Sequence, residues 1–318
     1  MQIGLINNLR AGRNFKQVSR ILDLLRSYPH VWHVETNHVE ALPEAIDDLA
    51  RRKIDLLVIN GGDGTLQHTL TELLVDRPFG KVPMIAPLTG GSANMTALDL
   101  GASRNPVKGL KAVLDAAAAG TLDERIVDRP VIRIEFERGH RVAYGMFFGA
   151  GMIRRAVLLV HDVFPQGRGQ GSFGAGIATL ALVAKTALKP KQGILTPDKI
   201  QIALDDKPVG QGESYLTIST TLRRLFWGIE PFWGPEKGDL RFTSVASSAR
   251  RFGAAAPGIL RGKPRSFVTP KNGYTSHNAG HAELRMSCGF TVDGEIFDQQ
   301  SDDVVRLSAG RPVSFIRA

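Results

Sequence analysis

The segment with the clearest chemical character is Gly61-Gly62-Asp63-Gly64-Thr65. An apolar run over residues 54–59 precedes it and predicts a buried parallel strand, and a helical pattern begins at Leu66. Glycines let the backbone approach a phosphate, and the start of a helix presents free N–H groups. Because a carboxylate repels phosphates, Asp63 would instead bind Mg²⁺ or accept a proton. The loop therefore indicates phosphoryl transfer, although a tight strand-to-helix connection would also use glycines.

A second loop of the same kind follows the next predicted strand. It runs from Thr89 to Asn94 with Gly90, Gly91 and Ser92 between them, and it precedes a helix predicted over 93–100. Ser92 and Asn94 can cap that helix or contact a ligand. In open α/β sheets, ligands bind at the carboxyl ends of the strands, where both loops lie. The two loops together favour a phosphate site more than either does alone.

Two further segments end strands with polar residues. The first strand, over residues 2–7, is followed by Asn8 and by a turn that contains two arginines and a glycine. The residues of this turn could bind a phosphate, but a plain strand-to-helix turn would explain them equally well. Near the other end of the chain, Asp293-Gly294-Glu295 follows a strand. Asp-Gly is a strong hairpin signal, so the segment is either a plain hairpin tip or an acid carried to the mouth of a nucleotide site.

The elements that must position these loops alternate between strand and helix in the first part of the chain. Strands are predicted over 2–7, 31–36, 54–59 and 82–87, and helices over 15–27, 39–52, 66–75, 93–100 and 106–119. This alternation predicts a parallel sheet covered by helices on both faces. After Gly120 the pattern changes to short alternating segments, with one helical insertion near 153–188. The fold class is therefore α/β, with a nucleotide-binding α/β domain followed by a mainly antiparallel β domain.

The composition of the chain limits which partners and which compartment we expect. The chain has 318 residues, a formal net charge of +9 and one cysteine, Cys288, so it has no intrachain disulfide and fits a reducing cytoplasm. The positive charge favours a nucleotide, a nucleic acid or an acidic lipid surface. Six cations and no acid lie between Arg250 and Lys271, a segment that could rest on anionic headgroups or simply be solvated. No signal peptide or membrane span is recognisable, so we expect a cytoplasmic protein that can contact the inner face of the membrane.

Together these segments resemble the diacylglycerol kinase and sphingosine kinase family of lipid kinases, in its soluble bacterial form. The loop at 61–65 matches the nucleotide loop of that family, and residues 8–13 resemble its Asn-Pro-x-Ser-Gly-Lys motif, with Leu9 in place of the proline. Residues 91–101 resemble its Gly-Thr-x-Asn-Asp-x-Ala…Leu-Gly segment, and residues 293–295 match its late Asp-Gly-Glu. The order of the motifs agrees over nearly the whole chain.

The resemblance implies a nucleotide domain over 1–121, completed by a last strand returning at 308–318, and a β-sandwich lipid-substrate domain over 122–307. It implies ATP and Mg²⁺ as cofactors, and as partner a lipid with a free hydroxyl at a membrane surface, rather than a nucleic acid. The residues that would bind the nucleotide are Asn8, Thr36, Gly61, Gly62, Gly64, Thr65, Gly91, Ser92 and Asn94. Asp63 and Glu295 are the candidates for the general base, with Glu295 preferred and Asp293 as a further catalytic acid.

One departure from the family pattern concerns the metal. Met95 stands where the family has an acid of its Mg²⁺ network, whereas Asp128 matches the next member of that network and is the predicted metal ligand. A protein that binds nucleotide or lipid without catalysis is therefore one alternative. An NAD kinase is another, because that family shares the loop at 61–65, but its later Thr-Pro-Thr-Gly-Ser-Thr segment has no counterpart here.

Overall fold

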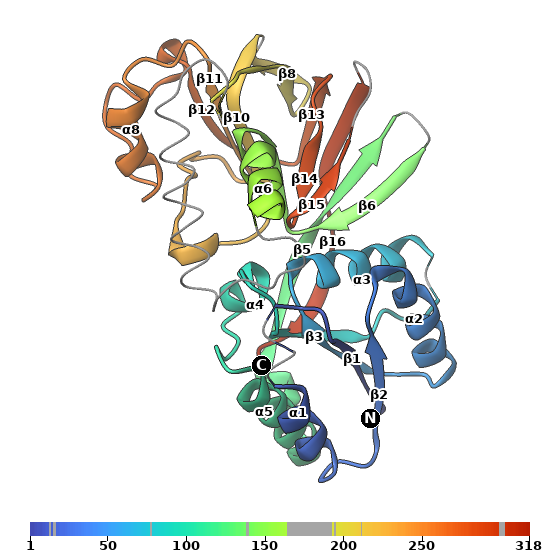
Figure 1. Cartoon of the computed structure of the whole chain (residues 1–318). Coiled ribbons are helices and arrows are strands. Elements are labelled where there is room, and N and C mark those ends of the chain that lie inside the picture. The colour runs from blue at the N-terminus through green and yellow to red at the C-terminus, as the bar shows by residue number, and fades with distance from the viewer. Residues whose placement is uncertain are drawn as a thin grey trace. The chain divides into compact units, whose positions relative to one another are not determined.

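The computed structural model describes residues 1–12, 14, 17–76, 78–137, 140–163, 193, 195–210, 212–298 and 303–318. Contacts divide these residues into two compact units (Figure 1). Unit 1 comprises 1–129 and 311–318, and unit 2 comprises 130–163 and the described part of 193–310. Among the described residues, the chain passes from one unit to the other within strands β5 (Ile126–Phe136) and β16 (Asp303–Ile316). The domain boundaries at 121 and 308 stay a prediction.

Unit 1 is built on a parallel sheet. The order of its strands is β2 (Val31–Thr36), β1 (Ile3–Asn8), β3 (Leu56–Gly61), β4 (Met84–Thr89) and the end of β16, where Phe315 pairs with Ile85. Every residue of β3 is buried, as expected for a strand covered on both faces. The parallel sheet confirms the α/β class predicted for this part of the chain.

The helices of unit 1 lie on both faces of this sheet (Figure 1). α1 (Val18–Leu25) and α5 (Pro106–Ala119) pack against alternate residues of the strands, in one apolar core. On the other face, Leu49 of α2 (Leu42–Arg51) lies against Gly4, and α2 packs beside α3 (Asp63–Val75). The short α4 (Met95–Asp99) follows β4, and two 3-10 turns, η2 (Val39–Ala41) and η3 (Leu122–Arg125), complete the unit.

The helix bounds differ from the prediction, most clearly at α3 and α2. α3 begins at Asp63 rather than Leu66, because Gly62 is extended and an acid in the first turn of a helix interacts favourably with its dipole. The helix expected over 39–52 is divided into η2 and α2, and proline occupies the first turn of α2, where its missing N–H costs no hydrogen bond. The first correction places the carboxyl group of Asp63 at the very start of the helix.

Unit 2 contains two sheets of antiparallel strands that are joined where residues 213–214 pair with residues 198–199. One joins β9 (Lys207–Gly210), β8 (Asp198–Leu204), β13 (His281–Met286), β16, β5 and β6 (Arg141–Gly145). The other joins β15 (Glu295–Phe297), β14 (Phe290–Val292), β7 (Phe147–Gly151), β10 (Glu213–Thr220), β11 (Leu240–Ala246) and β12 (Tyr274–Ala279). Buried side chains from both sheets form one core, with Ile134 and Leu284 from the first and Phe148 and Phe242 from the second. This arrangement confirms the mainly antiparallel β part of the predicted fold.

The helical elements of unit 2 connect its strands. They are α6 (Met152–Val163), η5 (Phe226–Gly228), α8 (Phe252–Ile259) and η6 (Pro270–Asn272). α6 is the start of the helical insertion predicted near 153–188, and the rest of that prediction lies outside the described residues. Among the helices described, none is both long and apolar enough to cross a bilayer.

Candidate functional site

The two glycine loops lie against each other at the carboxyl ends of β3 and β4. Gly61 pairs with Thr89 in the sheet. One residue further along the first loop and two along the second, a Cβ atom added to Gly91 would lie only 2.3 Å from the Cα atom of Gly62. A Cβ atom on Gly61 would lie 2.6 Å from the Cβ of Thr65. Gly61 and Gly91 are therefore required for the packing of the loops, whether or not the loops also bind a ligand. Gly62 is the N-cap residue of α3 and has no side chain that could cover the first N–H groups of the helix.

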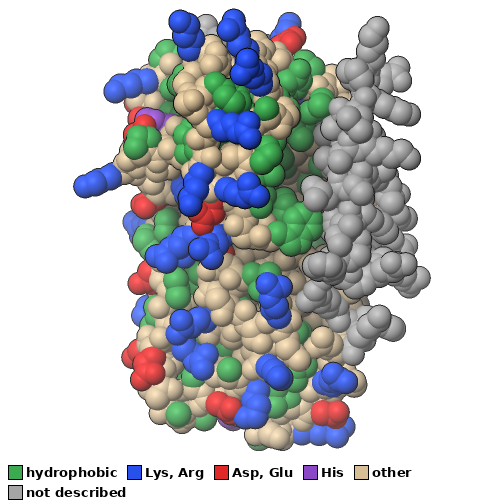
Figure 2. Space-filling model, turned by 90° about the vertical axis from the view of Figure 1, so that its left-hand side faces the viewer, with side chains coloured by type: hydrophobic (Ala, Val, Ile, Leu, Met, Phe, Trp, Pro, Cys, Tyr) green, Lys and Arg blue, Asp and Glu red, His purple; other side chains and the backbone are tan. Residues whose placement is uncertain are grey.

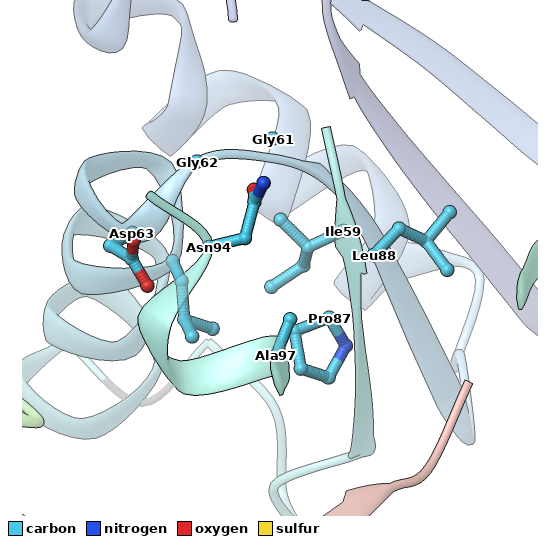
Figure 3. A pocket seen from close by; sticks show the side chains of 9 residues that line it. Ile59, Gly61, Gly62, Asp63, Pro87, Leu88, Asn94 and Ala97 are labelled. Carbon is cyan, nitrogen blue, oxygen red and sulfur yellow. The ribbon is translucent and has the colours of Figure 1, made fainter. Parts of the chain in front are cut away.

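The carboxyl group of Asp63 spans from one loop to the other. Its two oxygens accept hydrogen bonds from the backbone N–H groups of Met95 at 2.9 Å and Thr96 at 3.0 Å, so Asp63 caps α4 from outside (Figure 3). Burial raises the pKa of Asp63 above its ordinary value, and the hydrogen bonds from Thr96 and Met95 oppose that rise. A carboxylate with a raised pKa is a stronger base than an exposed one, which agrees with the predicted role in proton transfer.

Asn94 closes the second loop. Its backbone is left-handed, with φ 52° and ψ 40°, a conformation that asparagine tolerates better than most residues. Its side-chain oxygen accepts from the Gly91 N–H at 2.7 Å, and its amide nitrogen donates to the Gly91 carbonyl at 2.8 Å. The predicted contact of Asn94 with nucleotide would therefore come in addition to a structural role. Ser92, in contrast, is exposed at the tip of the loop.

Asn8 connects the end of β1 with α3. Its amide nitrogen donates to Thr65 Oγ1 at 2.8 Å, and its oxygen accepts from the backbone N–H of Arg10 at 2.9 Å. Asn8 also pairs with Thr36 in the sheet. Thr36 Oγ1 is buried and has no hydrogen-bond partner among the described residues. The structure thus brings Asn8, Thr36 and Thr65 to the same edge of the sheet as the glycine loops.

A cluster of buried asparagines beneath the loops was not predicted. Asn7, Asn14 and Asn60 are fully buried. Asn60 donates to Asn7 Oδ1 at 2.8 Å, and Asn14 donates to the carbonyls of Asn8 and Asn60, both at 2.7 Å. A Cβ on Gly90 would lie 2.6 Å from the side-chain oxygens of both Asn14 and Asn60, so the cluster also requires this glycine. The one available sequence signal was a polar Asn60 at the end of an otherwise apolar strand.

A small pocket opens beneath the two loops (Figure 3). The Asn94 side chain points toward the backbone of Gly61 and Gly62, and below it the pocket is apolar. Its apolar lining consists of Ile59, Leu66, Pro87, Leu88 and Ala97. Apolar walls of this kind do not bind phosphate. We therefore assign any phosphate contact to the outer, backbone side of the loops.

Asp293 and Glu295 belong to unit 2, at the hairpin between β14 and β15. The carboxyl oxygens of Asp293 accept from the backbone N–H groups of Met146 at 2.8 Å and Phe147 at 2.9 Å. Asp293 is buried and its backbone is left-handed at φ 51°. This carboxylate therefore ties the hairpin to β7. Glu295 begins β15 and is partly exposed. A catalytic role for either acid beside Asp63 stays a prediction.

Asp128, the predicted metal ligand, is exposed and accepts a hydrogen bond from Ser314 Oγ at 2.7 Å. The neighbouring Arg129 pairs with the nearly buried Asp99 at 3.5 Å. Within the part of the chain that the structure describes, His, Cys, Asp and Glu side chains nowhere gather in groups of three or more that could hold a metal. Mg²⁺ commonly uses only one or two carboxylates, with water and phosphate oxygens as its other ligands. Asp128 or Asp63 fits that limited role.

Comparison with known proteins identifies unit 1. Residues 2–122 match the family model described as the diacylglycerol kinase catalytic domain. These residues belong to that family. The resemblance found in the sequence is thereby confirmed. In a comparison of sequences, no curated protein matches the chain.

Solved structures extend the similarity of fold beyond the diacylglycerol kinase catalytic domain. A protein of Bacillus anthracis str. Sterne, provisionally assigned as a diacylglycerol kinase, superposes with a TM-score of 0.69 over 99% of this chain and 96% of its own, at 18% identity. A second structure, described as a diacylglycerol kinase of the same organism, gives a TM-score of 0.61 at 17% identity, over 99% and 96% of the two chains. At these identities the similarity shows the fold, including that of unit 2.

Within the diacylglycerol kinase catalytic domain, the position of Met95 is now explained structurally. Its side chain is buried and its backbone N–H is capped by Asp63. Because it packs into the domain, Met95 offers no ligand where the family has an acid. Any Mg²⁺ bound with the nucleotide would have to rely on other groups of the site.

Proposed function

We propose that this protein is an ATP-dependent lipid kinase that transfers the γ-phosphate to a lipid hydroxyl, with a diacylglycerol-like acceptor. One observation carries the proposal. The two glycine loops of a diacylglycerol kinase catalytic domain lie side by side at the carboxyl ends of β3 and β4, with the Asp63 carboxyl group between them. That edge of a parallel sheet is where α/β proteins bind nucleotides. The names of the Bacillus structures support the same class of acceptor.

The residues of unit 1 suggest how the triphosphate would be held. The first turn of α3 follows Gly62 directly, so backbone N–H groups and the positive end of the helix can face phosphate oxygens. The hydroxyl groups of Thr36 and Thr65 lie at the same edge of the sheet. Mg²⁺, when bound, would neutralise charge on the triphosphate, and positioning and electrostatics would supply most of the catalysis.

The acceptor hydroxyl needs a base, since its own pKa lies far above 7. Asp63 is held in one orientation by two hydrogen bonds and has a raised pKa, two properties that suit a base. Glu295 is a partly exposed acid at the start of β15, in the hairpin of unit 2. We retain both candidates, because the two acids can be separated by mutation.

One observation favours a second candidate function, binding without turnover. Met95 removes a carboxylate from the metal network of the family, and Asp63 is already engaged in capping α4. A protein that binds nucleotide or lipid but transfers no phosphate would have these same features. An NAD kinase-like activity has no comparable support, since the family match is to diacylglycerol kinases.

The test is transfer of labelled γ-phosphate from ATP, with Mg²⁺, to a panel of lipid alcohols in mixed micelles. Wild type is compared with Asp63→Asn, Glu295→Gln and the control Asp206→Asn, which neutralises a carboxylate that is 93% exposed in an unrelated turn. We expect labelled lipid from wild type and the control, and a loss of at least 100-fold in the variant that lacks the base. Thermal melting of each variant separates loss of activity from loss of folding. If the protein binds ATP but transfers phosphate to no acceptor, NAD included, the proposed kinase function is refuted and binding without turnover is supported.

A further inference from the structure

Unit 2 exposes a group of large apolar side chains on one surface. Phe226 is 39% exposed, Trp227 is 55% exposed and Leu260 is 44% exposed. The Phe226 and Trp227 rings meet edge-on with their centroids 5.1 Å apart. Trp227 has a left-handed backbone with φ 56°, which a bulky residue rarely adopts. Several exposed apolar side chains in one region, unlike a single one, point to an interaction surface.

The backbone joins the two separate segments that carry these side chains. The Glu230 N–H donates to the Leu260 carbonyl at 3.0 Å. Gly262, with φ 63°, lies so close to the other segment that an added Cβ would be 2.9 Å from the Glu230 carbonyl oxygen and 3.1 Å from that of Phe232. The turn after η5 and the turn after α8 are therefore held against each other by their backbones and form one continuous surface.

Positive charge surrounds these apolar side chains. The segment 250–271, which contains α8, carries six cations and no acid, and all six are exposed. They are Arg250, Arg251, Arg261, Lys263, Arg265 and Lys271. The one acid of the neighbouring 223–230 segment, Glu230, is ion-paired with Arg224 at 3.0 Å. Figure 2 shows this side of the molecule, where Lys and Arg side chains gather on the upper part with hydrophobic side chains between them.

We propose that this basic-aromatic surface, formed by residues 223–230 and 250–271 of unit 2, docks on a lipid bilayer with anionic headgroups. Tryptophan and phenylalanine enter the boundary between headgroups and acyl chains, while surrounding cations bind the charged headgroups. The charge excludes a cationic or purely apolar partner. A single-stranded nucleic acid would also bind cations and stack on aromatic rings. It would gain no contact from the exposed Leu260 side chain, whereas a bilayer would bury that side chain.

The surface deepens the proposed function, because a kinase acting on a lipid must reach its acceptor in the membrane. Only the use of the surface in catalysis rests on that function. Binding of the protein to vesicles can be measured without ATP and without any acceptor. Failure of the docking surface and failure of the kinase are therefore distinguishable.

The experiment measures co-sedimentation of the full chain with phosphatidylcholine vesicles, with and without phosphatidylglycerol, and the tryptophan emission of the bound protein. Three variants are compared with wild type. The aromatic variant is Phe226→Ala with Trp227→Ala, the charge variant is Arg261→Gln, Lys263→Gln and Arg265→Gln, and the matched control is Lys53→Gln, Lys81→Gln and Lys108→Gln, three exposed cations of unit 1.

We expect wild type and the control to bind the anionic vesicles with a blue shift of tryptophan emission. Since one cation near an anionic leaflet strengthens binding about fivefold, the charge variant should bind on the order of 100-fold more weakly. The aromatic variant should lose the blue shift. The proposal is overturned if wild type ignores anionic vesicles, if both variants bind like the control, or if wild type prefers a single-stranded oligonucleotide to the vesicles. If the protein binds vesicles but phosphorylates no lipid, the docking surface is supported and the proposed kinase function is refuted.

Discussion

The contact between the two glycine loops allows a quantitative test of the site, because its two glycines are not equivalent. A Cβ on Gly91 would lie 2.3 Å from the Gly62 Cα, whereas a Cβ on Gly62 would lie 3.3 Å from the Gly91 Cα. The first distance is more than 1 Å below an ordinary contact and involves backbone on both sides. The strands that carry these loops are themselves paired, at Gly61 and Thr89, so the loops cannot simply separate.

Gly91→Ala should therefore be far more damaging than Gly62→Ala. Overpacking costs about 1–3 kcal/mol and occasionally more. We expect about 3 kcal/mol for Gly91→Ala and at most about 1 kcal/mol for Gly62→Ala, where a shift of a few tenths of an ångström suffices. For a unit of this size, the larger value corresponds to a loss on the order of 10 °C in Tm.

The assay is differential scanning calorimetry of the purified full-length variants, since the two units can unfold in separate transitions. Gly80→Ala is the matched control, because an added Cβ there meets nothing within 4 Å. It should leave the Tm unchanged or raise it slightly. Equal Tm values for the Gly91 and Gly62 variants, or a Gly91 variant as stable as wild type, would show that the loops do not pack as described.

Two further predictions concern the acids. Asp293→Asn keeps the left-handed backbone but replaces one of the two carboxylate acceptors with a donor. Urea denaturation should therefore show a free energy of unfolding lower by about 1–3 kcal/mol than that of wild type. A free energy of unfolding equal to that of the Asp206→Asn control would contradict the hydrogen bonds that tie Asp293 to β7. For Asp63, the pKa is raised in the folded protein, so its contribution to stability is present below the unfolded value of about 3.9 and is lost as pH rises through the folded pKa. The stability of wild type relative to Asp63→Asn should therefore fall as pH rises above about 4, and a pH-independent difference would exclude the raised pKa.

Local patterns predicted much of unit 1. The glycine loops and the parallel sheet followed from apolar runs, turn residues and the family resemblance. These features depend on neighbours in the sequence, so a single chain reveals them. The start of α3 was placed three residues late because the apolar periodicity begins at Leu66, whereas the helix itself begins where Asp63 can interact with its dipole.

Contacts between distant segments were not predictable in the same way. Asp63 caps residues that lie 32 and 33 positions further along the chain, and nothing in either segment alone indicates that pairing. The buried residues Asn7, Asn14 and Asn60 each make a hydrogen bond in the folded state, and one further polar side-chain atom of each has no partner among the described residues. Likewise, the basic segment 250–271 was visible in the sequence, but its position beside the 223–230 segment depends on the backbone bond between Glu230 and Leu260.

The return of β16 to unit 1 has a consequence for biosynthesis. Phe315 pairs with Ile85, Ile316 and Ala318 lie in the apolar core of unit 1, and the Ala318 carbonyl accepts from the Ser103 N–H at 2.6 Å. Until a ribosome has released these residues, the edge of β4 lacks its partner strand, and an unpaired edge invites pairing with other chains. All of unit 2 must therefore be synthesised before the sheet of unit 1 is complete, and the unpaired edge of β4 is open to pairing with other chains until then.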